Sequence, residues 1–322
     1  MVYDEIYQSF WKNNILLEVV IPTYNRVDNL TLLINNLLKS SNRNFCISII
    51  DNDPSNLLST EFIKSNNINR IPIRVLRNKI HLGPDASILR SIELSESDWI
   101  YCLGDSKIPV DNAFDLIVND IKENSDISSI VYKFKNSNEF ATTISNVSEI
   151  ANKDIHWGDL FLIGNSVISA KLVKNYFSTA TQFTLSRSML FIFHILALKN
   201  NHKVLFSNNR IVKEFLEKPA FYNPGLSLLE CWAQFPLLVN LPIKNNERMV
   251  VIDKIIKGES WDDKITFYKF CLLKIFRENI DISFNLKTIL AYRYCYKMFY
   301  FEKTIIITLY YTSKLNHFIR GG

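Results

Sequence analysis

Asp105, Ser106 and Lys107 form the corner of the sequence in which catalytic chemistry is easiest to place. They follow a short apolar run, residues 99–103, and a glycine. A carboxylate at such a corner could hold a divalent cation, whose ligands are mostly carboxylate oxygens. An ammonium group two residues later repels the ion, but it could pair directly with phosphate oxygens. The stretch therefore predicts a metal site with Asp105 as ligand, a phosphate site that needs little metal, or a solvated surface turn.

Five apolar runs in the first 135 residues alternate with amphipathic segments. Continuous apolar runs are typical of parallel strands covered on both faces, and apolar spacings of three and four residues are typical of helices. This rhythm predicts βαβ units and an α/β fold with a mostly parallel sheet and flanking helices. Asp28 or Asn29 is expected to cap the first helix, and Asp85 the second. The predicted strands are residues 16–21, 46–50, 73–78, 99–103 and 127–134, and the predicted helices are residues 30–38, 85–94 and 111–121.

A polar cluster follows each of the first four predicted strands. Because ligands of such sheets bind beyond the carboxyl ends of the strands, the clusters predict one shared crevice. One cluster alone would be an ordinary loop, whereas four after four successive strands indicate a binding site. The clusters are Thr23, Tyr24, Asn25 and Arg26; Asp51, Asn52 and Asp53; Arg77 and Asn78; and Asp105, Ser106 and Lys107.

Composition limits the class of protein. The chain of 322 residues is 48% hydrophobic and 21% charged, which suits a folded globule rather than a disordered chain. Its N-terminal segment lacks the basic and apolar regions of a signal peptide, and no stretch is apolar for long enough to span a membrane. Five scattered cysteines, never in a C-x-x-C pair, favour free thiols over disulfides or a zinc site. We therefore expect a cytoplasmic protein.

The excess positive charge lies at the C-terminal end. Residues 285–322 carry six Lys or Arg and one Glu, and this balance of +5 equals the net charge of the whole chain. They also hold nine aromatic residues, and cations mixed with Tyr and Phe suit a membrane interface. The segment predicts either peripheral membrane contact, or a helix that packs on the protein's own core or on the second subunit of a homo-oligomer. No nucleic-acid partner is expected, because no basic stripe occurs elsewhere.

Taken in order, these segments resemble the glycosyltransferases of family 2, which have the GT-A fold. The resemblance rests on "VVIPTYNR", "ISIIDNDPS" and "RNKIHLGPDASILRSIELSESDWIYCLGDSKIP"; it is good over residues 15–110 and weaker over 155–210. The nearest type is the bacterial O-antigen and capsule transferases of the abequosyltransferase kind. The resemblance implies a nucleotide-sugar-binding half at 1–135, an acceptor-binding half at 136–250, and a helical C-terminal extension at 251–322.

The resemblance also implies roles for single residues. Asp51 would accept a hydrogen bond from the nucleobase, and Asn52 and Asp53 would lie near the ribose. Asp105 matches the first acid of a metal motif, whereas a serine and Lys107 stand at the other two acid positions. This departure favours a site rebuilt around Lys107, to which Mn²⁺ or Mg²⁺ contributes little. The implied donor-binding residues are Pro22, Thr23, Tyr24, Asn25, Arg26, Asp51, Asn52, Asp53, Arg77, Gly83, Asp85, Asp105 and Ser106.

The general base is the second departure from the family pattern. Members usually carry a Glu-Asp pair just before an amphipathic helix, which here resembles residues 189–206, but no acid lies at 187–189. Asp159 and His194 are the first candidates to replace it, and Glu214 and Glu217 lie further along the chain. A histidine among apolar neighbours is also typical of a core residue, and a base elsewhere in the chain stays open.

These features predict an inverting glycosyltransferase at the inner face of a bacterial membrane. It would move a sugar from a nucleotide-sugar donor to a hydroxyl of a glycan or lipid-linked glycan acceptor for O-antigen, capsule or lipopolysaccharide. The alternative is a catalytically silent relative that keeps the nucleotide site and serves as a partner or scaffold in a glycan assembly complex. Loss of the acid motif and of the Glu-Asp pair favours this alternative.

Overall fold

The computed structural model describes residues 3–9, 15–55, 61–67, 70–133, 141–152, 159–160, 163–183, 189–215 and 243–247, and single positions at 304, 307, 308 and 311. The chain divides into two compact units, residues 1–184 with 188–217, and residues 185–187 with 218–322. The helices and strands named below belong to the first unit. The predicted boundaries at 135 and 250 stay predictions. The predicted extension from residue 251 lies almost entirely outside the described residues.

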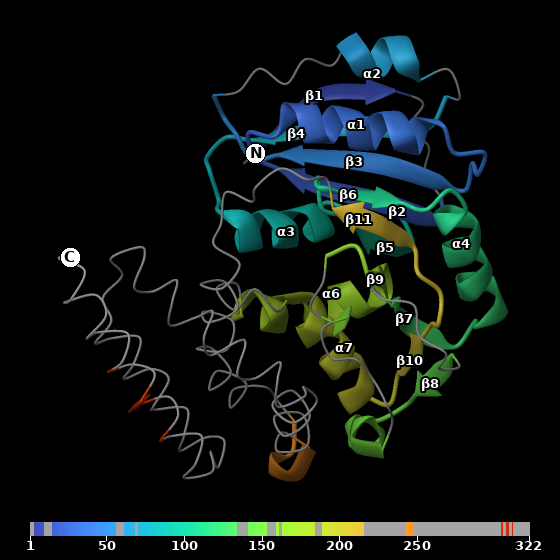
Figure 1. Cartoon of the computed structure of the whole chain (residues 1–322), viewed down its shortest axis with the longest axis vertical. Helices are drawn as coiled ribbons and strands as arrows, with labels where there is room; N and C mark the ends of the chain where they lie inside the picture. The colour runs from blue at the N-terminus through green and yellow to red at the C-terminus, as the bar shows by residue number, and fades with distance from the viewer. Residues whose placement is uncertain are drawn as a thin grey trace. The chain divides into compact units, whose positions relative to one another are not determined.

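A nine-stranded mixed sheet forms the centre of the first unit, in the order β1-β4-β3-β2-β5-β9-β7-β10-β8 (Figure 1). The strands β4, β3, β2 and β5 are parallel, and β1, β9 and β8 are antiparallel to their neighbours. A separate two-stranded sheet pairs β6 with β11. The strands are β1 (Tyr3–Ser9), β2 (Leu17–Thr23), β3 (Phe45–Asp51), β4 (Ile73–Asn78), β5 (Trp99–Cys102), β6 (Lys107–Pro109), β7 (Ile127–Val131), β8 (Thr142–Ile144), β9 (Ser166–Ser169), β10 (Lys203–Phe206) and β11 (Val212–Phe215).

Helices cover the sheet and supply its core. The apolar stripes of α1 and α4 are buried in the same hydrophobic cluster as the odd-numbered residues of β2 and β3. The helix α3 contacts β2, β3 and β5, and α6 packs on α7 and β9. Among the described residues, no helix is both long and apolar enough to cross a membrane. The helices are α1 (Val27–Leu38), α2 (Glu61–Asn66), α3 (Pro84–Glu93), α4 (Ala113–Glu123), the 3-10 helix η1 (Val147–Asn152), α6 (Ala170–Thr181) and α7 (Met189–Lys199).

The α/β fold and the five predicted strands are confirmed, but three local predictions are wrong. The helix expected over 189–206 ends at Lys199, because Asn201 adopts a left-handed conformation with φ of 57°, and the next residues form β10. The predicted caps are first-turn residues instead: α1 is preceded by Arg26 and α3 by Gly83. An acid in the first turn still favours each helix through the helix dipole.

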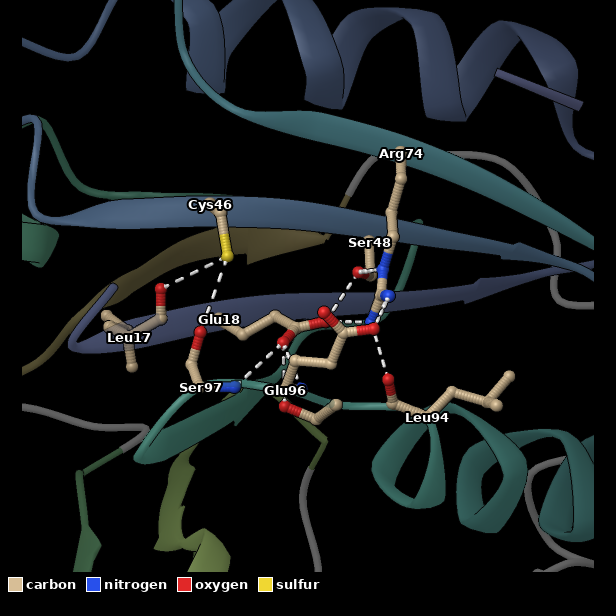
Figure 2. Close-up of polar contacts among 9 residues, drawn as sticks. Leu17, Glu18, Cys46, Ser48, Arg74, Leu94, Glu96 and Ser97 are labelled. Atoms are coloured by element: carbon tan, nitrogen blue, oxygen red, sulfur yellow. Dashed lines mark hydrogen bonds and ion pairs between the residues drawn. The ribbon is translucent and has the colours of Figure 1, made fainter. Parts of the chain in front are cut away.

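A buried ion pair joins the amino ends of the parallel strands (Figure 2). Arg74 in β4 contacts Glu18 in β2 with 3.0 Å between Nη2 and Oε1, and its Nε donates to Ser48 Oγ of β3 at 2.7 Å. The other oxygen of Glu18 accepts from Ser95 Oγ and from the backbone N–H of Glu96. We call Glu18, Cys46, Ser48, Arg74, Ser95, Glu96 and Ser97 the amino-edge cluster.

The amino-edge cluster ties a loop to the sheet. Arg74 also donates to the carbonyl oxygen of Leu94 and pairs with Glu96, so the loop between α3 and β5 is held at several points. The Cys46 thiol lies 3.5 Å from Ser97 Oγ. A buried ion pair is tolerated when further hydrogen bonds satisfy its remaining polar atoms, as they do here. The cluster therefore stabilises the start of β5, the strand that leads to Asp105.

Candidate active site

The strand register places three predicted site residues in a row at the carboxyl edge of the sheet. Thr23 at the end of β2 pairs with Asp51 at the end of β3, and Asp51 pairs with Arg77 near the end of β4. Neighbouring residues in register point to the same face of a sheet. We call Thr23, Arg26, Asp51, Asn52, Arg77 and Asp105 the carboxyl-edge cluster, because the strand register and the contacts below together join all six.

Asp105 connects the end of β5 to the loop after β2. Its Oδ2 accepts a hydrogen bond from Thr23 Oγ1 at 2.9 Å, and its Oδ1 lies 3.0 Å from Arg26 Nη1 in an ion pair. Burial raises the pKa of Asp105, and the charge of Arg26 and the Thr23 hydrogen bond oppose that shift. Asn25 turns the chain between these partners with a φ of 51°. Pro22 in β2 and Ser106 in the turn after β5 lie half-buried next to them in sequence.

Asp51 and Arg77 form the second ion pair of the carboxyl-edge cluster. Arg77 Nε lies 2.9 Å from Asp51 Oδ2, and the backbone N–H of Asp53 donates to Oδ1 at 3.0 Å. Burial raises the pKa of Asp51, while the hydrogen bond from the backbone N–H of Asp53 and the contact with Arg77 act in the opposite direction. Arg77 Nη2 is buried and has no hydrogen-bond partner among the described residues. Arg77 can therefore still donate a hydrogen bond from Nη2 while its Nε holds the Asp51 carboxylate.

Asn52 holds the loop that follows β4. Its Oδ1 accepts from Asn78 Nδ2 at 3.0 Å and from the backbone N–H of Leu82 at 3.1 Å, and its Nδ2 donates to the carbonyl oxygen of Gly83. Its own backbone N–H donates to the carbonyl oxygen of Thr23 at 2.9 Å. The amide of Asn52 is thus committed to the protein, and a ribose contact from it stays a prediction.

The loop held by Asn52 places an aromatic pair at the same edge. The rings of Tyr24 and His81 have centroids 4.3 Å apart, and both side chains are exposed. Gly83 has a φ of 76°, which favours glycine, and it precedes α3, whose first turn contains Asp85. The sequence reasoning named Tyr24, Gly83 and Asp85 but not His81.

Lys107 is not a solvated turn residue. The residue is only 4% exposed, and the ammonium nitrogen of its side chain is buried. The backbone N–H of Lys107 donates to the carbonyl oxygen of Gly104 at 3.1 Å, which closes the turn around Asp105. Burial lowers the pKa of Lys107 to about 8, and the charges of Cys102 and Asp159 act in the opposite direction. The surface-turn interpretation is therefore wrong for this corner.

The donor set at Asp105 does not suit a divalent cation. Both carboxylate oxygens are engaged, one by a hydroxyl and the other by the guanidinium of Arg26. A cation would have to displace Arg26 and would stand near a second buried cation, Lys107, in the same turn. In the part of the chain that the structure describes, no three His, Cys, Asp or Glu side chains form a group that could hold a metal ion without help from a substrate. We therefore derive no step through a metal.

The two predicted bases lie in different surroundings. His194 in α7 is 0% exposed, and its ring nitrogens lie 3.0 Å from Ser129 Oγ and 2.9 Å from Ser166 Oγ. Burial lowers the pKa of His194 to about 3. It is a hydrogen-bonded core residue, and the structure gives it no access to a substrate hydroxyl. Asp159 is buried, and its charge acts on Lys107. Of the further candidates, Glu214 lies in β11 and Glu217 lies outside the described residues.

The fold and this edge of the sheet define an α/β protein with a cluster of charged and polar residues at the carboxyl ends of its parallel strands, and comparison with known families identifies its class. The family described as "Glycosyl transferase family 2" matches residues 18–190, more than half of the chain. The chain therefore belongs to glycosyl transferase family 2.

Two curated relatives match a smaller part of the chain. It is 35% identical over 92 residues to abequosyltransferase RfbV of Salmonella typhimurium, covering 28% of this chain and 27% of that protein. It is 24% identical over 120 residues to an uncharacterized glycosyltransferase of Haemophilus influenzae, covering 37% and 39%. The matches thus span well under half the length of either relative.

Solved structures share the fold at low sequence identity. TarS residues 1–349 from S. aureus align with a TM-score of 0.54 and 13% identity, covering 95% of this chain and 92% of that one. The mannosyltransferase PcManGT from Pyrobaculum calidifontis, in complex with GDP-Man and Mn²⁺, aligns with a TM-score of 0.58 and 7% identity, covering 98% and 90%. These likenesses confirm the GT-A fold predicted from the sequence.

Proposed function

We propose that the protein is an inverting glycosyltransferase that moves a sugar from a nucleotide-sugar donor to a hydroxyl of a bacterial surface glycan. The acceptor hydroxyl attacks the anomeric carbon and loses its proton to a general base, while the bond from that carbon to the nucleotide phosphate breaks. The acceptor class is a glycan or lipid-linked glycan of the O-antigen, capsule or lipopolysaccharide type.

The observation that carries this proposal is that Thr23 and Arg26 both contact Asp105 at the carboxyl edge, two residues before the buried Lys107. A departing nucleotide phosphate needs positive charge, and fixed cations in a site with little water supply it without reorganisation. Arg26 pairs with Asp105, and Lys107 follows Asp105 two residues later, at the position that matches the metal motif of the family. Arg77 supports the same role for the nucleotide half of the donor.

Two features support the donor and acceptor classes. Membership of family 2 supports a nucleotide-sugar donor, and the relatives crystallised with UDP-GlcNAc and with GDP-Man show such donors in proteins of this fold. The similarity to abequosyltransferase RfbV supports a bacterial O-antigen type of acceptor. The basic and aromatic composition of residues 285–322 supports peripheral contact with the membrane on which lipid-linked glycans are built.

Calorimetric titration tests the proposal directly. Purified protein is titrated with UDP, GDP, dTDP and CMP, each with Mn²⁺ and again with EDTA. We expect one nucleotide to bind in both conditions and to bind more weakly to Lys107→Ala. Binding that requires Mn²⁺ would contradict the role given to Lys107, because the metal ion would then supply the positive charge that the phosphate needs.

The same titration separates the enzyme from the silent alternative. The nucleotide that binds identifies the class of sugar donor, which is then incubated with lipid-linked glycan acceptors and followed by mass spectrometry. Sugar transfer supports the proposal, and the anomeric configuration of the product decides whether the reaction inverts. Nucleotide binding without sugar transfer would favour the silent relative that keeps the nucleotide site, and absence of binding to all four nucleotides would overturn the proposal.

A further inference from the structure

Gly164 forms a cradle for the stem of Lys107. A Cβ atom at Gly164 would lie 2.9 Å from Lys107 Cδ, closer than carbon atoms approach, and the φ of Gly164 is 97°. Two hydrogen bonds hold this glycine: the Tyr101 hydroxyl donates to its carbonyl oxygen at 2.9 Å, and its N–H donates to the carbonyl oxygen of Cys102 at 2.9 Å. Gly164 therefore places the stem of Lys107 near the end of β5.

Asn165, the next residue, brings a carboxylate to the same place. Asn165 Nδ2 donates to Asp159 Oδ1 at 3.4 Å, and Asp159 is only 6% exposed. The backbone of Asn165 is itself anchored, because its carbonyl oxygen accepts from the N–H of Tyr132 at 2.7 Å. Gly164 borders the stem of Lys107 and Asn165 contacts Asp159, so two consecutive residues connect the lysine stem to a carboxylate.

We propose that Asp159 is a positioning residue that acts through Lys107, holding and directing the ammonium group at the end of β5 toward the phosphate of the donor. The proposal rests on the proposed function in one respect, that Lys107 meets a donor phosphate. It gives Asp159 a role different from that of the general base, for which Asp159 was one of the candidates.

The chemistry of a buried ammonium group favours this role. Removing a cation from water is costly unless a counter-charge lies nearby, and Asp159 is the carboxylate whose charge acts on Lys107. Asp159 therefore suits the role of a counter-charge for Lys107.

The test is a double-mutant cycle on nucleotide binding in EDTA, with no acceptor present. Wild type, Asp159→Asn, Lys107→Ala and the double variant are titrated with UDP, GDP, dTDP and CMP. We expect Asp159→Asn to weaken binding by about ten- to a hundredfold, as loss of one partner of a buried charge pair does. In the Lys107→Ala background the same change should have almost no effect, because its target is gone.

Two further variants guard the test against trivial outcomes. Gly164→Ala leaves Asp159 intact but forces the lysine stem to move, so it should weaken binding as Asp159→Asn does, and it serves if Asp159→Asn does not fold. Asp120→Asn is the matched control: Asp120 is a carboxylate of α4 that accepts from Ser207 Oγ at 3.2 Å, and its replacement should leave nucleotide affinity unchanged.

The outcomes distinguish this inference from the function on which it rests. If wild type binds a nucleotide and Asp159→Asn binds it equally well or more tightly, the inference is overturned and the proposed function stands. Loss of sugar transfer at unchanged nucleotide affinity would identify Asp159 as the base instead. If wild type binds none of the nucleotides, the proposed function fails and the inference fails with it.

Discussion

Two arginines three residues apart in β4 show how differently the two edges of one sheet are built. Arg74 lies in the amino-edge cluster, where its guanidinium donates to a serine, two glutamates and a backbone carbonyl. Arg77 lies in the carboxyl-edge cluster, where Nε contacts Asp51 and Nη2 is buried with no hydrogen-bond partner among the described residues. The first arginine is saturated by the protein, and the second is not.

This difference indicates which edge supports the fold and which edge serves binding. Buried polar groups are nearly always hydrogen-bonded, so a buried group without a partner needs an explanation. Within the described residues, Asn78 Oδ1 at the end of β4 is a second such atom, whereas the amino-edge cluster contains none. A saturated cluster stabilises the structure, and an edge that keeps unused donors and acceptors retains capacity for a polar ligand.

Replacement of Arg74 should produce the largest effect on stability. Arg74→Met leaves Glu18 buried without its counter-charge, and loss of one partner of a buried pair typically costs about 3–5 kcal/mol of unfolding free energy. Urea unfolding followed by circular dichroism measures the change. Lys79→Met, which removes an exposed pair with Asp4, is the control and should have little effect. Equal stability of the two variants would contradict a structural role for the amino-edge cluster.

His194 should make the fold sensitive to mild acid, because it is saturated like Arg74 but can titrate. Burial lowers its pKa from 6.5 to about 3, so the unfolded chain binds the proton more readily. The stabilisation is complete above pH 6.5 and is lost as the pH falls toward 3. We expect about 2 kcal/mol less stability at pH 5 than at pH 8 from this group.

His194→Gln provides the control for that prediction. Glutamine can hydrogen-bond to Ser129 and Ser166 but does not titrate, so the variant should lose the dependence between pH 5 and pH 7 while remaining folded. Urea unfolding at several pH values measures both slopes. An unchanged slope would mean that another group causes the sensitivity.

Replacement of Arg77 should weaken nucleotide binding as well as stability, because it also removes the counter-charge of the buried Asp51. The loss of binding is what distinguishes it from replacement of Arg74. Arg77→Met removes the charge at the nucleotide half of the carboxyl-edge cluster, and we expect about tenfold weaker nucleotide binding. Arg74→Met should bind with wild-type affinity once the fraction of unfolded protein is accounted for. If both variants lose affinity equally, the proposal that the carboxyl edge serves binding and the amino edge serves stability is wrong.

The two described cysteines should show the smallest effect, and they report on local opening. Burial raises the pKa of Cys46, at the amino edge, and of Cys102, at the end of β5, to about 12. Neither should react with iodoacetamide in the native protein at pH 8, because the thiolate is rare and covered. Peptide mass spectrometry after labelling in increasing urea measures each site. Modification of Cys102 before global unfolding would show that the carboxyl edge opens independently.

The sequence predicted the parallel core of the sheet and the meeting of its polar loops. Runs such as residues 46–50 are apolar at every position because both faces of β3 are covered, and that pattern needs no knowledge of partners. The strands β6, β9 and β11 were not predicted. Each is short, and its place depends on a neighbour distant in sequence, as when β9 pairs with β5 and β7. Gly164 and Asn165 were missed for the same reason.

By itself, the sequence determined the fold class, the family and the residues that reach the carboxyl edge, since these follow from local periodicity and from the order of motifs. The tertiary structure decided what those residues do there. In the fold, both oxygens of Asp105 and the side-chain amide of Asn52 are hydrogen-bonded within the protein. Lys107 is buried against Gly164, and His194 lies in the core. Burial and hydrogen-bond partners come from segments far apart in the chain, and they determine charge, pKa and access, which residue type alone does not.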